Sequence, residues 1–302
     1  MISVVINPGP GEAKEVAMPD ITRPDGAIIH YETFGRGHPL LLLAPGGVNS
    51  EIAFWERSRI NPIKEFAGEF MVIGMDQRHA GKSWSAPPTF SYDLTAADQV
   101  AVLDALGVAR AHVWGGCIGV AYVLRLIKEA PGRIGAAVGQ DPVGLDHTNS
   151  PATFQAMFAP TLDLAKREGT AAVVRSVLGD PMFVVNNAGG PFARRIKEDA
   201  AFRAQIAALS ATDYVALVQS FAAAIWPNSP PFFTVSEEWL SDCPAPLLIM
   251  PGSDAFHPTG IAHMICKTAP RARCLDVDCR SDAKLAASIQ VVRQFLKQYA
   301  TA

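Results

Sequence analysis

Short apolar runs alternate with helical segments along most of this chain, and this alternation limits the folds that it can adopt. Each run is rich in leucine or β-branched residues and ends in a loop that carries Gly, Pro or Asp. The runs cover residues 27–34, 40–44, 71–75, 111–114, 134–138, 247–250 and 273–277. Continuously apolar runs are typical of strands buried on both faces of a parallel sheet. Together with helical patterns at 94–106, 120–130 and 284–299, they predict a doubly wound α/β fold.

One long segment, residues 146–240, interrupts the alternation. It has little strand character and four helical patterns, at 152–167, 171–178, 191–209 and 213–225. We therefore predict a helical lid over residues 146–240, inserted into a core formed by residues 1–145 and 241–302. Segments at the carboxyl end of a parallel sheet commonly shape a ligand pocket.

The amino-acid composition excludes several kinds of chain and of binding partner. The 302 residues are 49% hydrophobic with a formal net charge of −3, which excludes a disordered or collagen-like chain. No cluster of Lys and Arg stands out, so neither a nucleic acid nor a membrane is expected as a partner. No apolar run reaches ~18 residues, and residues 1–14 do not resemble a signal peptide. We expect a cytoplasmic protein that acts on a small molecule, with a homodimer left open.

The five cysteines do not suggest a metal site or a disulfide framework. Their number is odd and no C-x-x-C occurs, so we expect reduced thiols and no metal.

One cysteine stands in an informative place. Residues 111–120 run from a strand through Gly115-x-Cys117-x-Gly119 into a helix. This is the layout of a nucleophile elbow, whose strained central residue needs small neighbours. The turn would hold the Cys117 sulfur at a helix N-terminus, where the partial positive charge favours the thiolate. The alternative is an inert cysteine in a tight turn.

Further motifs stand around the elbow in a set order. Residues 23–37 suggest a hairpin, 40–47 a strand that ends in Pro-Gly-Gly, 76–83 read DQRHAGKS, and 247–254 form a strand that ends at an aspartate. Over residues 20–145 and 240–300 the chain resembles the α/β-hydrolase family. The resemblance implies an eight-stranded, mostly parallel sheet with the lid after the sixth strand. It implies that Cys117 is the nucleophile, that the N–H groups of Gly47 and Ile118 form an oxyanion hole, and that Asp254 is the acid.

The sequence differs from the family at the position of the histidine that acts as general base. The family's histidine follows the last strand, but residues 278–283 contain none, and no histidine follows His263. His257, three residues after Asp254, is the first candidate replacement, and helix capping or a place in the pocket wall is the alternative. His79 is a second candidate, with a structural loop role as its alternative. Asp141 is a reserve acid, because some family members take the acid from that strand.

Two more residues face the expected pocket. Trp55 follows the oxyanion loop and either touches a ligand or packs in the core. Arg280 stands in the loop that lacks the histidine, where it could bind a carboxylate or be a surface charge.

These features predict a cofactor-free hydrolase of a small, mostly apolar ester, thioester, lactone or activated amide, with Cys117 as nucleophile. Two alternatives stay open: a catalytically reduced ligand-binding protein, and a lyase or isomerase that uses the same pocket.

Overall fold

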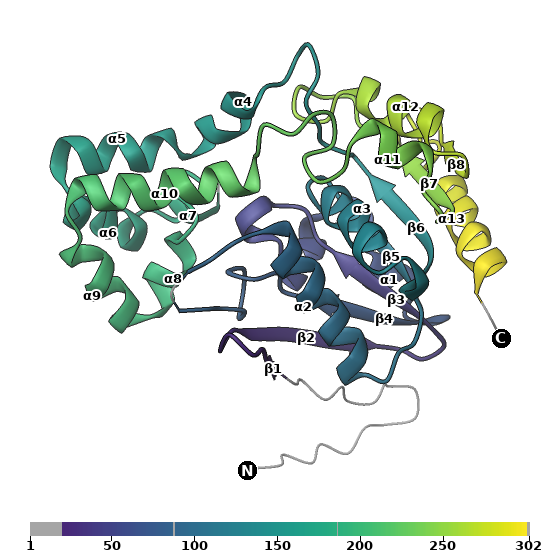
Figure 1. Cartoon of the computed structure of the whole chain (residues 1–302), viewed down its shortest axis with the longest axis horizontal. Coiled ribbons are helices and arrows are strands. Elements are labelled where there is room, and N and C mark those ends of the chain that lie inside the picture. The colour runs from purple at the N-terminus through teal and green to yellow at the C-terminus, as the bar shows by residue number, and fades with distance from the viewer. Residues whose placement is uncertain (1–19, 87, 186, 301–302) are drawn as a thin grey trace.

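The protein is built on one central sheet. The computed structural model describes residues 20–300 except 87 and 186, so the expectation for residues 1–14 lies outside the described residues. Within the described part, eight strands form a sheet of order β1-β2-β4-β3-β5-β6-β7-β8 (Figure 1). Their bounds are β1 Asp20–Thr22, β2 Ile28–Phe34, β3 His38–Leu43, β4 Phe70–Met75, β5 Ala111–Gly116, β6 Ile134–Gln140, β7 Leu247–Met250 and β8 Ala272–Cys274.

The sheet is mostly parallel, as the apolar runs predict. β2 pairs antiparallel with β1 and β4, and all pairs from β4–β3 through β7–β8 are parallel. Every predicted run coincides with a strand. Two details differ: the short β1 was not expected, and β8 ends at Cys274 rather than at residue 277. Both strands lie at sheet edges, where few neighbours contribute apolar burial and the sequence signal is weak.

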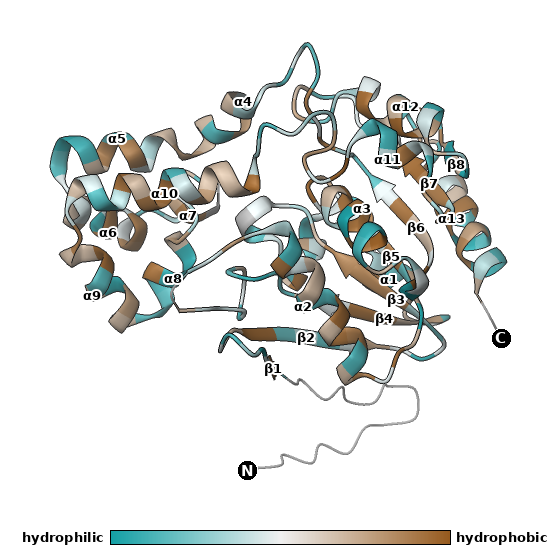
Figure 2. Ribbon diagram, viewed as in Figure 1, coloured by the Kyte–Doolittle hydropathy of each residue, from teal (hydrophilic) through white to brown (hydrophobic). Residues whose placement is uncertain are grey.

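Alternate residues of each central strand face two separate cores. In β3, Leu41 and Leu43 belong to one buried cluster, whereas Leu40 and Leu42 belong to the other. Figure 2 shows the central strands in brown between helices with mixed surfaces. The helices are α1 Pro62–Phe66, α2 Tyr92–Ala105, α3 Gly119–Glu129, α12 Thr259–Thr268 and α13 Leu285–Tyr299, with short 3-10 turns η1 Gly47–Asn49, η2 Ile52–Arg57 and η3 Pro131–Arg133. Burial on both sides explains the continuously apolar strands.

The chain between β6 and β7 is helical. We call residues 141–246 the helical insertion; its elements are α4 Pro151–Gln155, η4 Ala156–Phe158, α5 Ala159–Glu168, α6 Thr170–Gly179, α7 Pro181–Val185, α8 Ala193–Glu198, α9 Ala200–Ala208, α10 Ala211–Ile225 and α11 Glu237–Ser241. In Figure 1, α5–α10 extend to one side of the sheet, whereas α11 returns to the core beside α12. The helix expected over 191–209 is two helices, because the Asp199 side chain caps α9 by accepting from the N–H groups of Ala201 and Phe202.

Among the described residues, no single helix is long and apolar enough to cross a membrane. α9 and α10 together meet the length and composition criteria, but they are bent by 117° at the break between them.

The expectation of reduced thiols is wrong for two of the five cysteines. Cys266 in α12 and Cys274 in β8 form a disulfide that ties the helix to the edge strand. Their spacing does not indicate this pair, because only the fold brings a helix back along the neighbouring strand.

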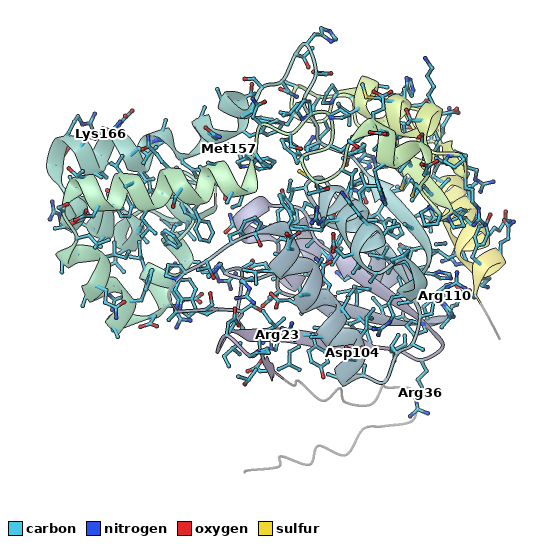
Figure 3. All side chains as sticks on the ribbon, viewed as in Figure 1. Arg23, Arg36, Asp104, Arg110, Met157 and Lys166 are labelled. Atoms are coloured by element: carbon cyan, nitrogen blue, oxygen red, sulfur yellow. A yellow bond between two sulfur atoms is a disulfide. The ribbon has the colours of Figure 1, made fainter. Side chains whose placement is uncertain are left out.

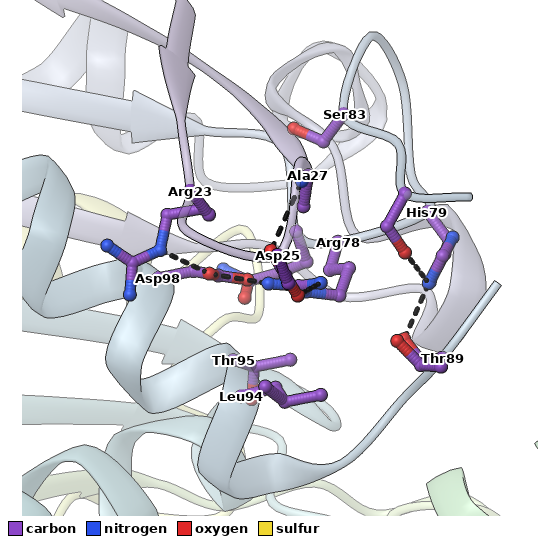
Figure 4. A network of polar contacts seen from close by, with 12 residues as sticks. Arg23, Asp25, Ala27, Arg78, His79, Ser83, Thr89, Leu94, Thr95 and Asp98 are labelled. Atoms are coloured by element: carbon purple, nitrogen blue, oxygen red, sulfur yellow. Dashed lines mark hydrogen bonds and ion pairs between the residues drawn. The ribbon is translucent and has the colours of Figure 1, made fainter. Parts of the chain in front are cut away.

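A buried ion-pair network holds the loop after β4 against the first hairpin and α2 (Figure 4). Asp98 of α2 accepts from Nε and Nη2 of Arg78 at 2.8 and 2.9 Å, and both side chains are 1% exposed. Arg23 donates to the same carboxylate at 2.9 Å, and Arg78 also donates to Asp25 at 2.6 Å. Bidentate pairs of this kind fix geometry as well as charge.

Asp98→Ala leaves the buried Arg78 without its main partner, and an uncompensated buried charge typically costs ~3–5 kcal/mol. We expect urea unfolding to show a loss of this size in the free energy of unfolding. Asp104→Ala, on the same helix, is the matched control, because its carboxylate is 61% exposed and pairs at the surface with Arg133. Equal, small losses in both variants would contradict this account of the network.

Candidate active site

The turn between β5 and α3 has the strained geometry of a nucleophile elbow. Cys117 has a φ of 55°, a left-handed conformation that side-chain-bearing residues rarely adopt. A Cβ on Gly115 would lie 2.3 Å from the Gly119 carbonyl oxygen, and one on Gly119 would lie 2.2 Å from the Leu43 oxygen. The Cys117 N–H donates to the Gln140 carbonyl at 2.8 Å. The two glycines therefore permit a turn that any larger residue would break.

The Cys117 side chain opens into a cavity of about 720 Å³. The helical insertion supplies an apolar part of its lining, and loops of the core supply most of the polar part. The lining residues are Pro45, Gly46, Gly47, Phe54, Arg57, Ser58, Arg59, Cys117, Gln140, Asp141, Val143, Phe154, Met157, Asn187, Trp226, Phe256, His257 and Arg280. The inert-cysteine alternative does not fit a half-buried sulfur that lines a cavity.

Asp254 and His257 form a pair within the single loop that follows β7. His257 Nδ1 lies 2.8 and 2.9 Å from the two carboxylate oxygens of Asp254. A carboxylate only accepts, so Nδ1 carries the proton, and Nε2 is left for another partner. The N–H groups of Phe256 and His257 also donate to Asp254, which shapes the loop into a turn.

The His257 ring lines the same cavity as Cys117 and interacts with it electrostatically. Burial alone would lower the pKa of this imidazole, but the interactions with Cys117 and Asp254 outweigh it and raise the pKa to about 9. The ring therefore favours its charged form near neutral pH, and a charged ring stabilises a neighbouring thiolate. Burial raises the pKa of Asp254, but its hydrogen bonds and the charge of His257 make the net shift downward.

Two main-chain N–H groups, of Gly47 and Ile118, are the candidate donors of an oxyanion hole. Gly47 begins η1 after Gly46, whose φ is 112°, and Ile118 immediately precedes α3. Among the hydrogen bonds of the described residues, neither the Gly47 N–H nor the Ile118 N–H has a protein acceptor. Gly47 lines the cavity, and free N–H groups beside a nucleophile are the chemistry of an oxyanion hole.

Asp141 also reaches the cavity, but in a different partnership. Its φ is 50°, and its carboxylate forms an ion pair with Arg280, the residue in the loop where the family's histidine was expected. Arg280 also donates to the Pro251 carbonyl at 3.1 Å, so it joins the loops after β6, β7 and β8.

Two expected residues lie elsewhere. Trp55 is 1% exposed and packs with Leu42 and Trp114 in the second core cluster, so packing rather than ligand contact is its role here. His79 Nε2 donates to the Thr89 carbonyl at 2.7 Å (Figure 4), and its ring packs edge-on against Trp84 and Phe221. Burial lowers the pKa of His79 to about 4, and the ring does not line the cavity.

Sequence reasoning did not single out Phe54, Arg57 and Arg59, which reach the cavity from η2 and the turn after it. They carry no motif. Their place depends on Asp76, whose side chain accepts from the Ile52 N–H at 2.8 Å and anchors the start of η2.

In residues 20–86, 88–185 and 187–300, no group of three or more His, Cys, Asp or Glu side chains is arranged to hold a metal ion.

The elbow, the loop order and the sheet agree with comparisons to known proteins. A model of the alpha/beta hydrolase fold matches residues 39–175. A hydrolase from Pseudomonas aeruginosa PA01 superposes with a TM-score of 0.62 at 21% identity, covering 93% of this chain and 98% of the other. A meta-cleavage product hydrolase from Pseudomonas fluorescens IP01 has a TM-score of 0.60 at 16% identity, covering 93% and 98%.

The chain has the α/β-hydrolase fold. Sequence relatives match a smaller part. A putative carbamate hydrolase RutD of Caulobacter segnis is 35% identical over 36% of this chain, and a zearalenone hydrolase of Bionectria ochroleuca is 31% identical over 45%. The chain spans 41% and 52% of the lengths of these two relatives.

Within this α/β-hydrolase fold, the free thiols differ in accessibility. Cys117 is half-buried, whereas Cys243 and Cys279 are buried, and burial raises the pKa of both, to about 11 for Cys279. A catalytic thiol at Cys279 therefore has no support.

We expect iodoacetamide at pH 7 to alkylate Cys117 first, because the free thiols Cys243 and Cys279 are buried. His257→Gln should slow this reaction several-fold, because it removes the ring that can take the proton of the thiol. Mass spectrometry of tryptic peptides measures the rate. His263→Gln, an exposed histidine on α12, is the matched control and should react like the wild type. An unchanged alkylation rate in His257→Gln would show that the imidazole does not affect the reactivity of the Cys117 thiol.

Gly252 packs between His257 and Asp141. A Cβ there would lie 2.4 Å from the His257 Cβ and 3.2 Å from Asp141 Oδ1. We expect Gly252→Ala to displace His257 and slow Cys117 alkylation to nearly the rate of His257→Gln, whereas Gly132→Ala, at an open site, should not. Wild-type alkylation in Gly252→Ala would show that the loop absorbs the methyl group.

Proposed function

We propose that this chain is a cofactor-free hydrolase of a small, mostly apolar ester, thioester, lactone or activated amide, with Cys117 as the nucleophile. The observation that carries the proposal is that Cys117, at a strained elbow, and His257, hydrogen-bonded to Asp254, line the same large cavity. A nucleophile, a base that it contacts and a group that orients the base are the parts that acyl transfer needs.

The proposed reaction has two halves. The Cys117 thiolate attacks the carbonyl carbon, and the N–H groups of Gly47 and Ile118 hold the negative charge that develops on the carbonyl oxygen. The bond to the leaving group then breaks, and protonated His257 gives its proton to that group. Water next attacks the thioester while His257 accepts its proton, and the carbon–sulfur bond breaks, which releases the acid and restores the thiolate beside the protonated ring. Asp254 keeps Nδ1 protonated and stabilises the charged ring.

The relatives' names support the reaction class. The putative carbamate hydrolase and the zearalenone hydrolase both have hydrolase names, and this chain shares about a third of the residues over the matched parts. The apolar wall formed by Val143, Phe154, Met157 and Trp226 suits an apolar acyl or aryl group.

A panel of p-nitrophenyl acetate, butyrate and hexanoate tests the proposal. We expect p-nitrophenol release and an acyl adduct on Cys117, both lost in Cys117→Ala, with kcat/KM reduced at least about 100-fold. Cys243→Ala, at a buried thiol away from the cavity, should keep turnover. Full turnover in Cys117→Ala would refute the nucleophile. No release and no adduct across the panel would favour a ligand-binding protein instead.

The pH profile tests the acid–base pair. Because the folded protein raises the pKa of His257 to about 9, kcat/KM should fall as pH rises through about 9, where the ring loses its proton. Asp254 favours the charged ring, so Asp254→Asn should move this alkaline limb to lower pH. Asp104→Asn should leave it in place. A limb that does not move in Asp254→Asn would show that the carboxylate does not act through His257.

A further inference from the structure

Three arginines line the catalytic cavity beside the apolar wall. Arg57 is the last residue of η2, Arg59 stands in the turn after it, and Arg280 lies in the loop after β8. We call these three residues the arginine cluster. They come from two loops of the core that are far apart in sequence, whereas the apolar wall is built largely by the helical insertion.

The charge of the cavity lining is opposite in sign to that of the chain. Three arginines and one carboxylate, Asp141, give the lining a formal charge of +2 before Cys117 and His257 are counted, whereas the whole chain carries −3. Like-signed charges around a concave site concentrate the field and attract counter-ions. The charge is therefore a local feature of the cavity.

The arginines differ in how far protein groups neutralise them. Asp141 pairs with Arg280. Arg59 pairs with Asp282, whose side chain is 98% exposed, and such surface pairs are weak and screened. Arg57 has no ion pair within the described residues, and its guanidinium lies 4.8 Å from the centroid of the Phe54 ring. Arg57 and Arg59 thus keep donors that a bound anion can use.

The cluster lies toward one end of the cavity. Arg59 and Arg280 also line a neighbouring hollow of about 420 Å³, together with Ser253, Asp278 and Ser281. No residue of the helical insertion lines that hollow, and Asp278 is paired with Lys284. The two arginines therefore stand where the cavity meets the hollow, away from the apolar wall.

The two shared arginines also repel each other. Burial and the nearby charge of Arg59 both lower the pKa of Arg280. Two guanidinium groups that line one hollow are stabilised when an anion binds between or beside them, and the planar fork of arginine matches a carboxylate.

We propose that the substrate carries a carboxylate, bound by the arginine cluster, in addition to the apolar part that packs on the helical insertion. This inference rests on the proposed function for the scissile bond. It adds that the substrate is two-ended: an apolar body at the insertion, the reacting carbonyl at Cys117, and an anionic end at Arg57 and Arg59.

Matched pairs of esters test the proposal from both sides of the scissile bond. The first pair is mono-p-nitrophenyl adipate and p-nitrophenyl hexanoate, whose six-carbon acyl chains end in a carboxylate or a methyl group. The second pair is 4-carboxyphenyl hexanoate and 4-acetylphenyl hexanoate. We expect the anionic ester of at least one pair to be preferred roughly tenfold or more in kcat/KM, since hydrogen bonds to charged groups are among the stronger ones. Added NaCl should reduce the preference.

Variants assign the preference to the cluster. Arg57→Gln and Arg59→Gln should each lower the ratio between anionic and neutral ester several-fold, and the double variant should bring it close to one. Arg36→Gln makes the same change in charge at an exposed site, far from the cavity residue Met157 in Figure 3, and should keep the wild-type ratio. Arg280 is not substituted, because its loss would leave Asp141 unpaired.

Binding without turnover separates this inference from the proposed function. Calorimetry on Cys117→Ala should show tighter binding of monomethyl adipate than of methyl hexanoate, with the difference lost in Arg57→Gln/Arg59→Gln. Equal turnover of both esters in both pairs, or a ratio that survives the double variant, overturns the anionic site and leaves the hydrolase intact. Failure of all four esters overturns the hydrolase, and the binding comparison then decides the anionic site alone.

Discussion

The strained turn at Cys117 is the constraint on which the rest of the site depends. A left-handed residue between β5 and α3 is tolerated because Gly115 and Gly119 leave no side chain between the helix and the ends of β3 and β5. The tight packing fixes the sulfur at the carboxyl edge of the sheet and leaves the Ile118 N–H unpaired beside it. The parallel order of the strands then brings the loops after β3, β6 and β7 to the same edge. The cavity lies where these loops meet.

The site also depends on which residues the loops after β7 and β8 carry. The loop after β7 carries both Asp254 and His257, whose contact needs only a three-residue turn. The loop after β8 instead carries Arg280, which is held by Asp141 and Pro251. His257 and Arg280 therefore come from different loops. Gly252 has no side chain, which lets His257 lie close to Asp141, the partner of Arg280.

The sequence predicts the parts of this protein that depend on local pattern. The apolar runs predict the strands, and Gly115-x-Cys117-x-Gly119 predicts the elbow. The arginine cluster depends on where distant segments meet, which no local pattern encodes. The disulfide joins cysteines only eight residues apart, but it depends on how α12 turns back along β8. His79 illustrates the limit: its loop suggests a candidate base, but packing against Trp84 and Phe221 gives the ring a structural place. His257 shows the opposite case, since adjacency to Asp254 in sequence already implies their contact.

The presence of both Asp254 and His257 on one short turn also changes how this scaffold can diverge. When such groups sit on separate loops, an insertion in either one alters their mutual distance, so both loops must be conserved together. Here Asp254 and His257 lie in the same loop, so their distance does not depend on the length of the loop after β8. Changes in the loop after β8 can alter substrate preference without changing the Asp254–His257 pair. Moving this pair to another scaffold requires only one loop.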